Sequence, residues 1–170
     1  MGYISFMADI ILIAHNLRSI HNVGSLLRTA DGLGVKTVYL TGYTPYPLSK
    51  NDSRLPHLAK KIDAQIAKTA LGAEKSQAWH HREDIKSLVR ELRSQEFLIA
   101  ALEQAQAAVK LPDFEPPTKI AVIVGREVEG LESEVLKLCD TVLEIPMLGN
   151  KESFNVVQAA AMALYHIRFN

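Results

Sequence analysis

The chain has 170 residues, 48% of them hydrophobic and 22% charged, so it can bury one good core and is not a disordered protein. Its 19 basic and 19 acidic residues give zero net charge, which counts against nucleic acid as a partner without excluding it, because a local patch is sufficient. The single cysteine, Cys139, excludes an intrachain disulfide and fits the reducing cytoplasm. No apolar run approaches the ~20 residues of a membrane span, and residues 1–14 lack the basic region and cleavage site of a signal peptide.

The first forty residues predict a β-α-β unit. Residues 9–14 (DIILIA) form a near-continuous apolar run, typical of a buried parallel strand. A helix is expected over residues 22–33, with Asn22 as its N-cap and apolar residues at i, i+3, i+4 and i+7. Gly24, near the start of this helix, is expected to let a ligand or another backbone come close. Residues 36–40 (KTVYL) predict the second strand, and the connection between the strands should be right-handed.

A long loop with three prolines, residues 42–58, comes next, and loops of this length in a compact domain are often functional. A short helix is expected over residues 59–71. Between residues 50 and 68, positive side chains outnumber negative ones by three, more than in any other surface segment of the chain. This segment is either a solvated surface or a surface that contacts a phosphate backbone.

The second half of the chain continues to alternate strands and helices. Trp79, His80 and His81 predict a short extended piece, and neighbouring histidines on a strand point to opposite faces, so no metal site is expected there. Ser133 is the expected N-cap of a short helix. The alternation predicts an α/β fold with a mostly parallel sheet flanked by helices. The expected elements are a helix over 84–93, a strand over 97–102, a proline-rich connection over 111–117, a buried strand over 120–124, a helix over 133–139, a strand over 141–144 and a last helix over 156–167.

Polar residues and glycines follow three of the predicted strands, at residues 15–24, 125–130 and 145–155, and ligands bind at such strand ends. Arg28 is either solvated, with Asp31 as an ion-pair partner, or a phosphate ligand. Glu127 is either a capping carboxylate or part of a cleft. Ser153 and Asn155 have a purely structural interpretation, in which Ser153 caps the last helix. Neither a dinucleotide fingerprint nor a Walker A loop is present.

In this order and spacing, NxRSxxNVGSLLRTADGLG, VIVGREVEGL and IPMLGNKESFNV resemble motifs 1, 2 and 3 of the SpoU/TrmH branch of the SPOUT superfamily. Members of this branch are S-adenosylmethionine-dependent RNA ribose 2′-O-methyltransferases. The resemblance extends over about residues 9–167 and implies a SPOUT-type fold with a deep C-terminal trefoil knot. It also implies a homodimer with the site near the subunit interface. Residues 1–170 are expected to form one catalytic domain, without the family's RNA-binding extensions at either end.

The resemblance implies a role for each motif residue. Arg28 would be the catalytic arginine, acting near the 2′-hydroxyl as an electrostatic organiser or as a base, with the organiser favoured. Asn22 would orient Arg28, while Glu127, Ser153 and Asn155 would hold the cofactor and substrate geometry. Phe154 stands where the family more usually has leucine. The expected S-adenosylmethionine contacts are Ala101, Leu102, Gly125, Ile145, Met147, Ser153 and Phe154, and the expected RNA contacts are Arg18, His21, Arg54, Lys60, Lys61, Lys68 and Arg126.

The substrate follows less directly from the sequence than the reaction does. The neutral charge and the missing extensions favour a small stem-loop of tRNA over rRNA. Two other classes stay open, namely a non-catalytic RNA-binding module of the same fold and an ordinary nucleotide-binding α/β protein. The intact motif residues argue against the first alternative, and the missing glycine-rich phosphate loop argues against the second. Methylation of a base instead of a ribose is a minor further alternative.

Overall fold

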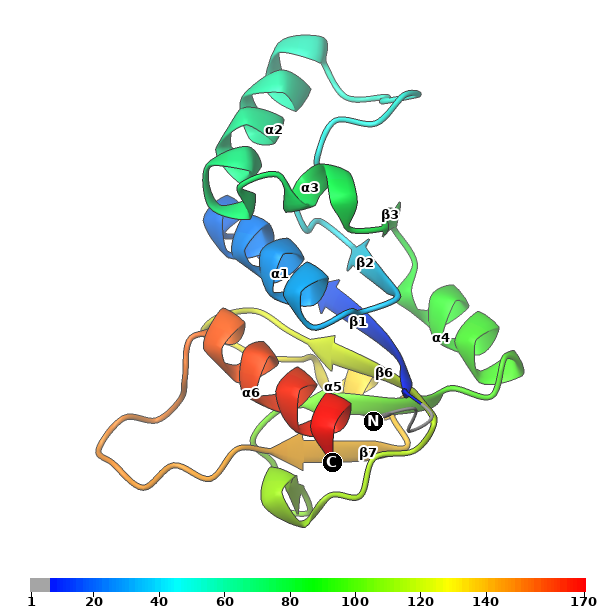
Figure 1. The fold of residues 1–170 in the computed structure, drawn as a ribbon, viewed down its shortest axis with the longest axis vertical. Helices are drawn as coiled ribbons and strands as arrows, with labels where there is room; N and C mark the ends of the chain where they lie inside the picture. The colour runs from blue at the N-terminus through cyan, green and yellow to red at the C-terminus, as the bar shows by residue number, and fades with distance from the viewer. Residues whose placement is uncertain (1–6) are drawn as a thin grey trace, which may run out of the picture.

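The computed structural model describes residues 7–170. Residues 1–6, which begin the segment without signal-peptide features, lie outside the described residues. A seven-stranded sheet runs through the centre of the molecule, and every strand pair in it is parallel (Figure 1). The predicted α/β class is therefore confirmed, with a sheet that is wholly parallel over the described residues. The spatial order is β3-β2-β1-β6-β4-β7-β5, with bounds β1 Asp9–His15, β2 Thr37–Thr41, β3 Trp79–Arg82, β4 Leu98–Leu102, β5 Val109–Lys110, β6 Lys119–Val124 and β7 Thr141–Glu144.

The helices lie on both faces of this sheet. The predicted helices are present with boundary shifts of up to three residues, and the short elements α3, β5 and η1 were not predicted. The helix expected over 133–139 ends earlier than predicted. The helical elements are α1 Ile20–Gly32, α2 Pro56–Ala70, α3 Ala73–Ser76, α4 Ile85–Ser94, η1 Leu111–Asp113, α5 Ser133–Leu136 and α6 Val156–Phe169.

Strand β1 shows why the sheet needs cover on both sides. Ile10 and Leu12 pack into the core formed with α1 and α6, whereas Ile11 and Ile13 pack into the core formed with α4 and α5. Because alternate side chains of a strand point to opposite faces, a strand that is buried on both faces reads as one continuous apolar run. Each fully buried Ile or Leu contributes roughly 1.5–3 kcal/mol of transfer free energy.

Helix α2 packs against α1 rather than against the sheet, as the upper part of Figure 1 shows. A Cβ atom at Gly24 would lie 2.2 Å from Thr69 Oγ1 and 2.4 Å from the Ile66 carbonyl oxygen. The two helix backbones therefore approach closely because position 24 has no side chain. Of the two expectations for Gly24, the close approach of another backbone is confirmed.

Three helix caps differ from the expected ones. Ser19 caps α1 by accepting a hydrogen bond from the Asn22 backbone N–H, so Asn22 lies in the first turn and not at the N-cap. Helix α5 is preceded by Glu132, with no side-chain cap, so Ser133 is its first residue. Asn155, not Ser153, caps α6, because its Oδ1 accepts a 2.9 Å hydrogen bond from the Val157 N–H.

The last helix is tied to the beginning of the chain. The Arg168 guanidinium donates hydrogen bonds to the carbonyl oxygens of Ala8 at 2.8 Å, Leu33 at 2.9 Å and Gly34 at 2.7 Å. One side chain thus joins α6 to the residue before β1 and to the turn between α1 and β2. None of the described helices is long and apolar enough to cross a membrane.

Candidate functional site

Three segments that are far apart in the sequence meet beside the N-terminus of α1. Glu127, in the loop after β6, accepts hydrogen bonds at Oε1 from the Ser19 N–H at 3.2 Å and from Asn22 Nδ2 at 3.1 Å. Its Oε2 accepts a longer bond, 3.5 Å, from the Arg18 N–H. A carboxylate at a helix N-terminus satisfies free backbone donors and interacts favourably with the helix dipole.

The ionisation of Glu127 follows from these contacts. Burial raises its pKa, but the hydrogen bonds from its own backbone, from Asn22 and from the backbone of Ser19 and Arg18 lower it by more. The pKa of Glu127 therefore lies below the ordinary value, and its carboxylate is charged at neutral pH.

Asn22 connects this carboxylate to the third segment. Its Nδ2 donates to Glu127, and its Oδ1 accepts a 3.5 Å hydrogen bond from Asn155 Nδ2 at the N-cap of α6. The three segments picked out in the sequence are thus joined side chain to side chain. Asn22, Glu127 and Asn155 are brought together as expected. Asn22 contributes from the first turn of α1, however, and not as the N-cap of that helix.

A cavity of about 250 Å³ opens next to this group, between the loops after β4, β6 and β7 and the start of α6. Leu102, Gly125, Ile145, Met147, Ser153 and Phe154 line it, which are six of the seven expected cofactor contacts. The seventh, Ala101, does not line it, because its side chain is fully buried on the α4 and α5 side of the sheet. Neighbouring strand residues point to opposite faces, so Ala101 and Leu102 cannot both present their side chains to one cavity.

Carboxylates at the edge of this cavity were missed in the sequence, apart from Glu127. Glu103, Glu129 and Glu152 line it together with Glu127, while Arg126 is the basic residue in its lining. Leu143 and Ala159 are among the apolar lining residues. Glu103 could have been found, because it follows directly on the carboxyl end of β4. The cavity therefore combines apolar walls with an excess of negative charge, which suits a partly apolar ligand that carries positive charge.

Two glycines shape the loop over the cavity. A Cβ at Gly125 would lie 2.7 Å from the Leu131 side chain, and one at Gly130 would lie 2.2 Å from Glu103 Oε2. Gly130 also has a positive φ of 68°, which other residues rarely adopt. Glu103 Oε2 instead accepts a 3.0 Å hydrogen bond from the Leu131 N–H. The absence of side chains at 125 and 130 lets this carboxylate hold the end of the loop.

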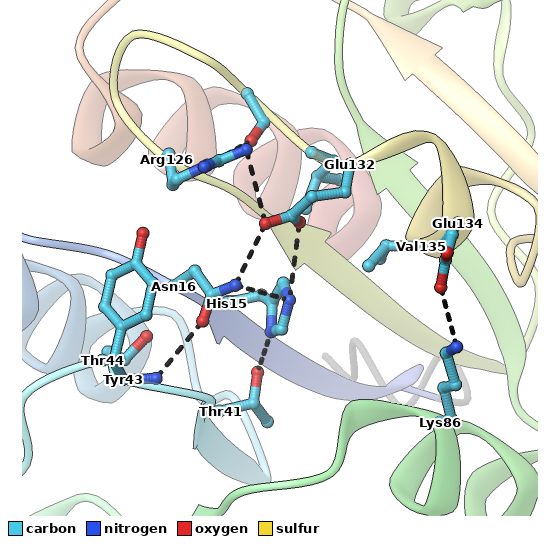
Figure 2. Close-up of polar contacts among 12 residues, drawn as sticks. His15, Asn16, Thr41, Tyr43, Thr44, Lys86, Arg126, Glu132, Glu134 and Val135 are labelled. Atoms are coloured by element: carbon cyan, nitrogen blue, oxygen red, sulfur yellow. Dashed lines mark hydrogen bonds and ion pairs between the residues drawn. The ribbon is translucent and has the colours of Figure 1, made fainter.

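A second polar cluster, absent from the sequence-based predictions, links the same loop to β1 (Figure 2). His15 is nearly buried; its Nδ1 lies 2.8 Å from Thr41 Oγ1 and its Nε2 lies 3.1 Å from Asn16 Nδ2. Asn16 Nδ2 also donates to Glu132 Oε1 at 3.1 Å, and Arg126 lies 3.4 Å from the same oxygen. Because the Asn16 amide is a donor, His15 Nε2 acts as an acceptor and its ring is neutral in this arrangement.

Burial favours the same neutral form. Desolvation lowers the pKa of His15, the nearby Glu132 raises it by less, and Arg126 lowers it further. Glu132 Oε2 lies 3.6 Å from His15 Nε2 and has no hydrogen-bond partner among the described residues. The cluster thus places a carboxylate oxygen without a donor next to a ring nitrogen that can gain a proton.

Arg28 occupies an exposed position on α1 and does not line the cavity of its own chain. The alternative in which Arg28 pairs with Asp31 is not observed, and Asp31 accepts a hydrogen bond from Ser76. Along the helix axis, Arg28 is about 9 Å from Asn22, at a rise of about 1.5 Å per residue. Within residues 7–170 its guanidinium has no hydrogen-bond or ion-pair partner.

The expected RNA contacts fall into two groups. Arg18 pairs with Glu129 at 2.9 Å, Arg126 lies near Glu132, and the guanidinium of Arg54 is held inside its own loop by Asp52. The second group remains exposed, with no salt bridge to the described residues: His21, Lys60, Lys61 and Lys68. The described residues contain no group of three or more His, Cys, Asp or Glu side chains arranged to hold a metal ion.

The chain is similar to known methyltransferases in sequence and in fold. The chain is 28% identical over 157 residues to a Staphylococcus aureus (strain COL) protein named as a TrmH family tRNA/rRNA methyltransferase, covering 92% of this chain and 57% of that one. It therefore spans little more than half the length of this relative. Among solved structures, AdoMet-bound rRNA methyltransferase from Sinorhizobium meliloti superposes with a TM-score of 0.78 at 18% identity, over 95% of this chain and 56% of that one.

A second solved structure matches in length as well. It concerns the 2-OH methylation of C/U34 on tRNA and superposes with a TM-score of 0.75 at 21% identity, over 96% of this chain and 95% of that one. At these identities the superpositions show a common fold. The model of the SpoU rRNA Methylase family matches residues 9–165, which include all three motif segments, and the chain therefore belongs to this family.

Proposed function

We propose that the chain is an S-adenosylmethionine-dependent RNA methyltransferase that modifies a ribose 2′-hydroxyl. The observation that carries the proposal is the junction of Asn22, Glu127 and Asn155 at the edge of a cavity lined by six expected cofactor positions. Membership of the SpoU family and the names of its relatives support the same reaction. The proposal covers the activity, the cofactor and the RNA, since the Staphylococcus relative and the Sinorhizobium structure are both longer than this chain.

The cavity suits S-adenosylmethionine in size and charge. Its volume of about 250 Å³ is near the lower end of ligand pockets, and its apolar walls can receive an adenine ring. The sulfonium and the amino group of the cofactor are both positive, and the lining carries four carboxylates against one guanidinium. When bound, the cofactor supplies a methyl group on a positively charged sulfur.

The residues of this chain would position the RNA hydroxyl. Its oxygen would take the methyl group, the electron pair of the broken carbon–sulfur bond would stay on sulfur as a neutral thioether, and the hydroxyl proton would pass to solvent. Arginine keeps its proton at neutral pH, so Arg28 acts as an electrostatic organiser of the hydroxyl and the adjacent phosphate. Glu127 fixes the start of α1, the helix that carries Arg28.

The position of Arg28 supports a homodimer as part of this function. Arg28 is exposed and does not reach the cavity lining of its own chain, whereas a second copy could present its Arg28 there. Helix α6 exposes Met162, Tyr165 and Phe169, and Phe154 is also exposed next to the cavity. Exposed apolar groups on a helix next to a site are suited to an interface between copies. The proposed fold of each subunit includes the trefoil knot of the family.

Transfer RNA is the proposed substrate, and the chain is proposed to act in the cytoplasm. The neutral charge favours a small RNA, and the solved structure that matches this chain over nearly its whole length concerns tRNA. Ribosomal RNA is the second candidate, because the Sinorhizobium structure is of an rRNA methyltransferase.

The test uses purified protein and methyl-labelled S-adenosylmethionine, with unmodified tRNA and rRNA as separate substrates. The product is digested to nucleosides, and Arg28→Ala is compared with Arg90→Ala, which removes an exposed arginine on α4. A 2′-O-methylnucleoside from tRNA that disappears only in Arg28→Ala supports the proposal. Cofactor binding without transfer to either RNA favours the non-catalytic RNA-binding module, and no cofactor binding rejects the methyltransferase.

A further inference from the structure

A second cavity, of about 360 Å³, lies between strand β3 and the loop that connects β2 to α2. It shares no lining residue with the cavity beside Glu127. We call it the β3 cavity. Its lining consists of Tyr46, Ser49, Asn51, Asp52, Ser53, Trp79, His80 and His81.

One wall of the β3 cavity is aromatic. The rings of Tyr46 and His81 are stacked, with centroids 4.0 Å apart and planes inclined by 23°. Trp79 lies against the same tyrosine at 6.4 Å, and its indole N–H donates to the Glu74 carbonyl oxygen at 3.0 Å. Flat π surfaces held in fixed orientations are the feature on which unpaired nucleobases stack.

The opposite wall is a loop that is held firmly in place. The Arg54 guanidinium donates from Nε to Asp52 Oδ1 at 2.8 Å, and also to the carbonyl oxygens of Tyr46 at 2.9 Å and Pro47 at 3.0 Å. It also lies over the Tyr46 ring, 3.6 Å from the centroid. The hydrogen bond from the Arg54 side chain holds the pKa of Asp52 well below its usual range, so the Asp52–Arg54 pair stays charged and intact. Arg54 therefore shapes the β3 cavity instead of offering a free cation to RNA.

Polar groups at the mouth of the β3 cavity are left without protein partners. Within residues 7–170, the side chains of Asn51 and Ser53 form no hydrogen bond with the protein, and both residues are exposed. Amide and hydroxyl groups can donate to and accept from the edge of a base. The same loop and helix α2 carry exposed cations that favour a polyanionic chain: Lys50, Lys60 and Lys61.

The β3 cavity is also coupled to the candidate active site through a short path. Thr44 Oγ1 donates to the Ala14 carbonyl oxygen at 2.9 Å and accepts from the Leu17 N–H at 3.0 Å. Tyr43 N–H donates to Asn16 Oδ1 at 3.2 Å, as Figure 2 shows. Residues 16–19 lead directly to the backbone N–H groups that bind Glu127. Only Pro45 separates Thr44 from Tyr46, so the aromatic wall is fixed relative to the site.

We propose that the β3 cavity binds an unpaired nucleobase of the RNA substrate, at a distance from the ribose that is methylated. The base would lie against Trp79 and His81, because His81 and Arg54 already cover the two faces of the Tyr46 ring, and its polar edge would face Asn51 and Ser53. The cavity volume lies within the range of about 300–1,000 Å³ typical of ligand sites. This inference rests on the proposed function for the identity of the RNA, but not for the existence of the site.

The chain contains a built-in probe for the test, because Trp79 is its single tryptophan. Short single-stranded RNA oligonucleotides of uniform base composition are titrated into the protein while Trp79 fluorescence is recorded. Free nucleoside monophosphates are titrated in parallel to separate RNA from a free nucleotide as the natural ligand. The variants are Asn51→Ala and Ser53→Ala, with His57→Ala as the control, which removes an exposed side chain outside the β3 cavity.

The proposal expects quenching by at least one oligonucleotide, with affinity about tenfold weaker in Asn51→Ala and Ser53→Ala and unchanged in His57→Ala. In methyl-transfer assays the two cavity variants should raise the KM for RNA by a similar factor and leave kcat nearly unchanged. Quenching together with no methyl transfer to any RNA would support the site while rejecting the proposed function. Intact methyl transfer with no quenching, or with equal quenching in all variants, would overturn the site and leave the proposed function standing.

Discussion

Asn22 Nδ2 and Glu127 Oε1 are 3.1 Å apart, and this hydrogen bond joins the first turn of α1 to the loop after β6. Hydrogen bonds to a charged group contribute about 1.5–3 kcal/mol, more than bonds between neutral groups. The amide of Asn22 can bridge because its two ends differ: the nitrogen donates to Glu127 and the oxygen accepts from Asn155. An aspartate at position 22 has two acceptor oxygens and cannot make the first of these bonds.

We therefore expect Asn22→Asp to be more harmful than Asn22→Ala. The alanine variant loses one bond to a charged group, which corresponds to about 10- to 100-fold in kcat/KM if the bond is kept in the transition state. The aspartate variant adds repulsion between two carboxylates. Methyl-transfer kinetics measure the first effect and thermal unfolding the second. Equal activity of the wild type and both variants would show that the bond does not position the site.

Close packing of α1 on α2 leads to a stability prediction at Gly24. In Gly24→Ala the new methyl group would meet the Ile66 carbonyl oxygen, which is backbone and cannot rotate away. We expect a loss of about 1–3 kcal/mol in the free energy of unfolding, measured by urea denaturation. A Thr69→Ala change should not rescue it, because the Ile66 contact remains.

Gly32→Ala is the matched control for this variant, since a Cβ there meets no atom within 4 Å. It lies at the end of the same helix, and the alanine reduces the freedom of the unfolded chain. We expect a gain of about 0.4–1 kcal/mol or no change. If both variants lost the same stability, the contact with Ile66 would not be the cause, because alanine has a higher helix propensity than glycine at both positions.

The lowered pKa of His15 predicts a pH dependence of stability. Above the ordinary value of 6.5 both the folded and the unfolded chain hold a neutral ring. As the pH falls through that value, the unfolded chain binds a proton and the folded chain does not, so stability decreases with falling pH down to the folded pKa. Melting temperatures measured between pH 7.5 and about pH 5 should therefore fall as the solution is acidified.

Replacement of His15 by glutamine removes the ring that binds a proton in the unfolded chain. The His15→Gln variant should be less stable at pH 7.5, because buried contacts to Thr41 and Asn16 change, but its melting temperature should vary less over the same interval. His57→Gln, at an exposed position, should keep the slope of the wild type. Glu127 and Glu132, whose pKa values are also lowered, contribute below their ordinary value of 4.5 and so fall outside the window. An unchanged slope in His15→Gln would contradict the assignment.

The proposed dimer predicts that two inactive variants restore activity when mixed. Arg28→Ala leaves the cavity intact, whereas Ala159→Phe places a ring in the cavity and leaves Arg28 intact. If Arg28 acts on the partner's cavity, a mixed dimer has one working site, and random mixing of subunits gives about a quarter of the wild-type activity. If Arg28 acts within its own chain, the mixture stays inactive. Circular dichroism of each variant checks that both fold.

The sequence predicted the sheet well because each strand that supports the site is buried on both faces and reads as an apolar run. It predicted the caps poorly: Ser19 and Asn22, like Ser153 and Asn155, are polar residues two or three positions apart, and both members of each pair can cap a helix. Only the path of the backbone decides between them. Short exposed elements such as β5 have no apolar period and cannot be detected in this way.

The pairing of side chains was the second feature that could not be predicted from the sequence. Counting charges placed Arg54 on an RNA-binding surface, but its guanidinium is used by Asp52 and two carbonyl groups of its own loop. The expected cofactor contact at Ala101 is through its backbone, which the alternation of side chains along β4 does not exclude. The junction of His15, Asn16 and Glu132 depends on residues more than a hundred positions apart, and no local pattern marks it.

The three hydrogen bonds of Arg168 have a consequence for how the molecule is completed during synthesis. Ala8 and Gly34 are synthesised early, but their partner follows 160 and 134 residues later in the chain. A chain made from its amino end therefore cannot form these hydrogen bonds until Arg168 has been synthesised. A nascent chain that stops before α6 lacks the contact between α6, the residue before β1 and the turn after α1, and we expect it to remain sensitive to protease there.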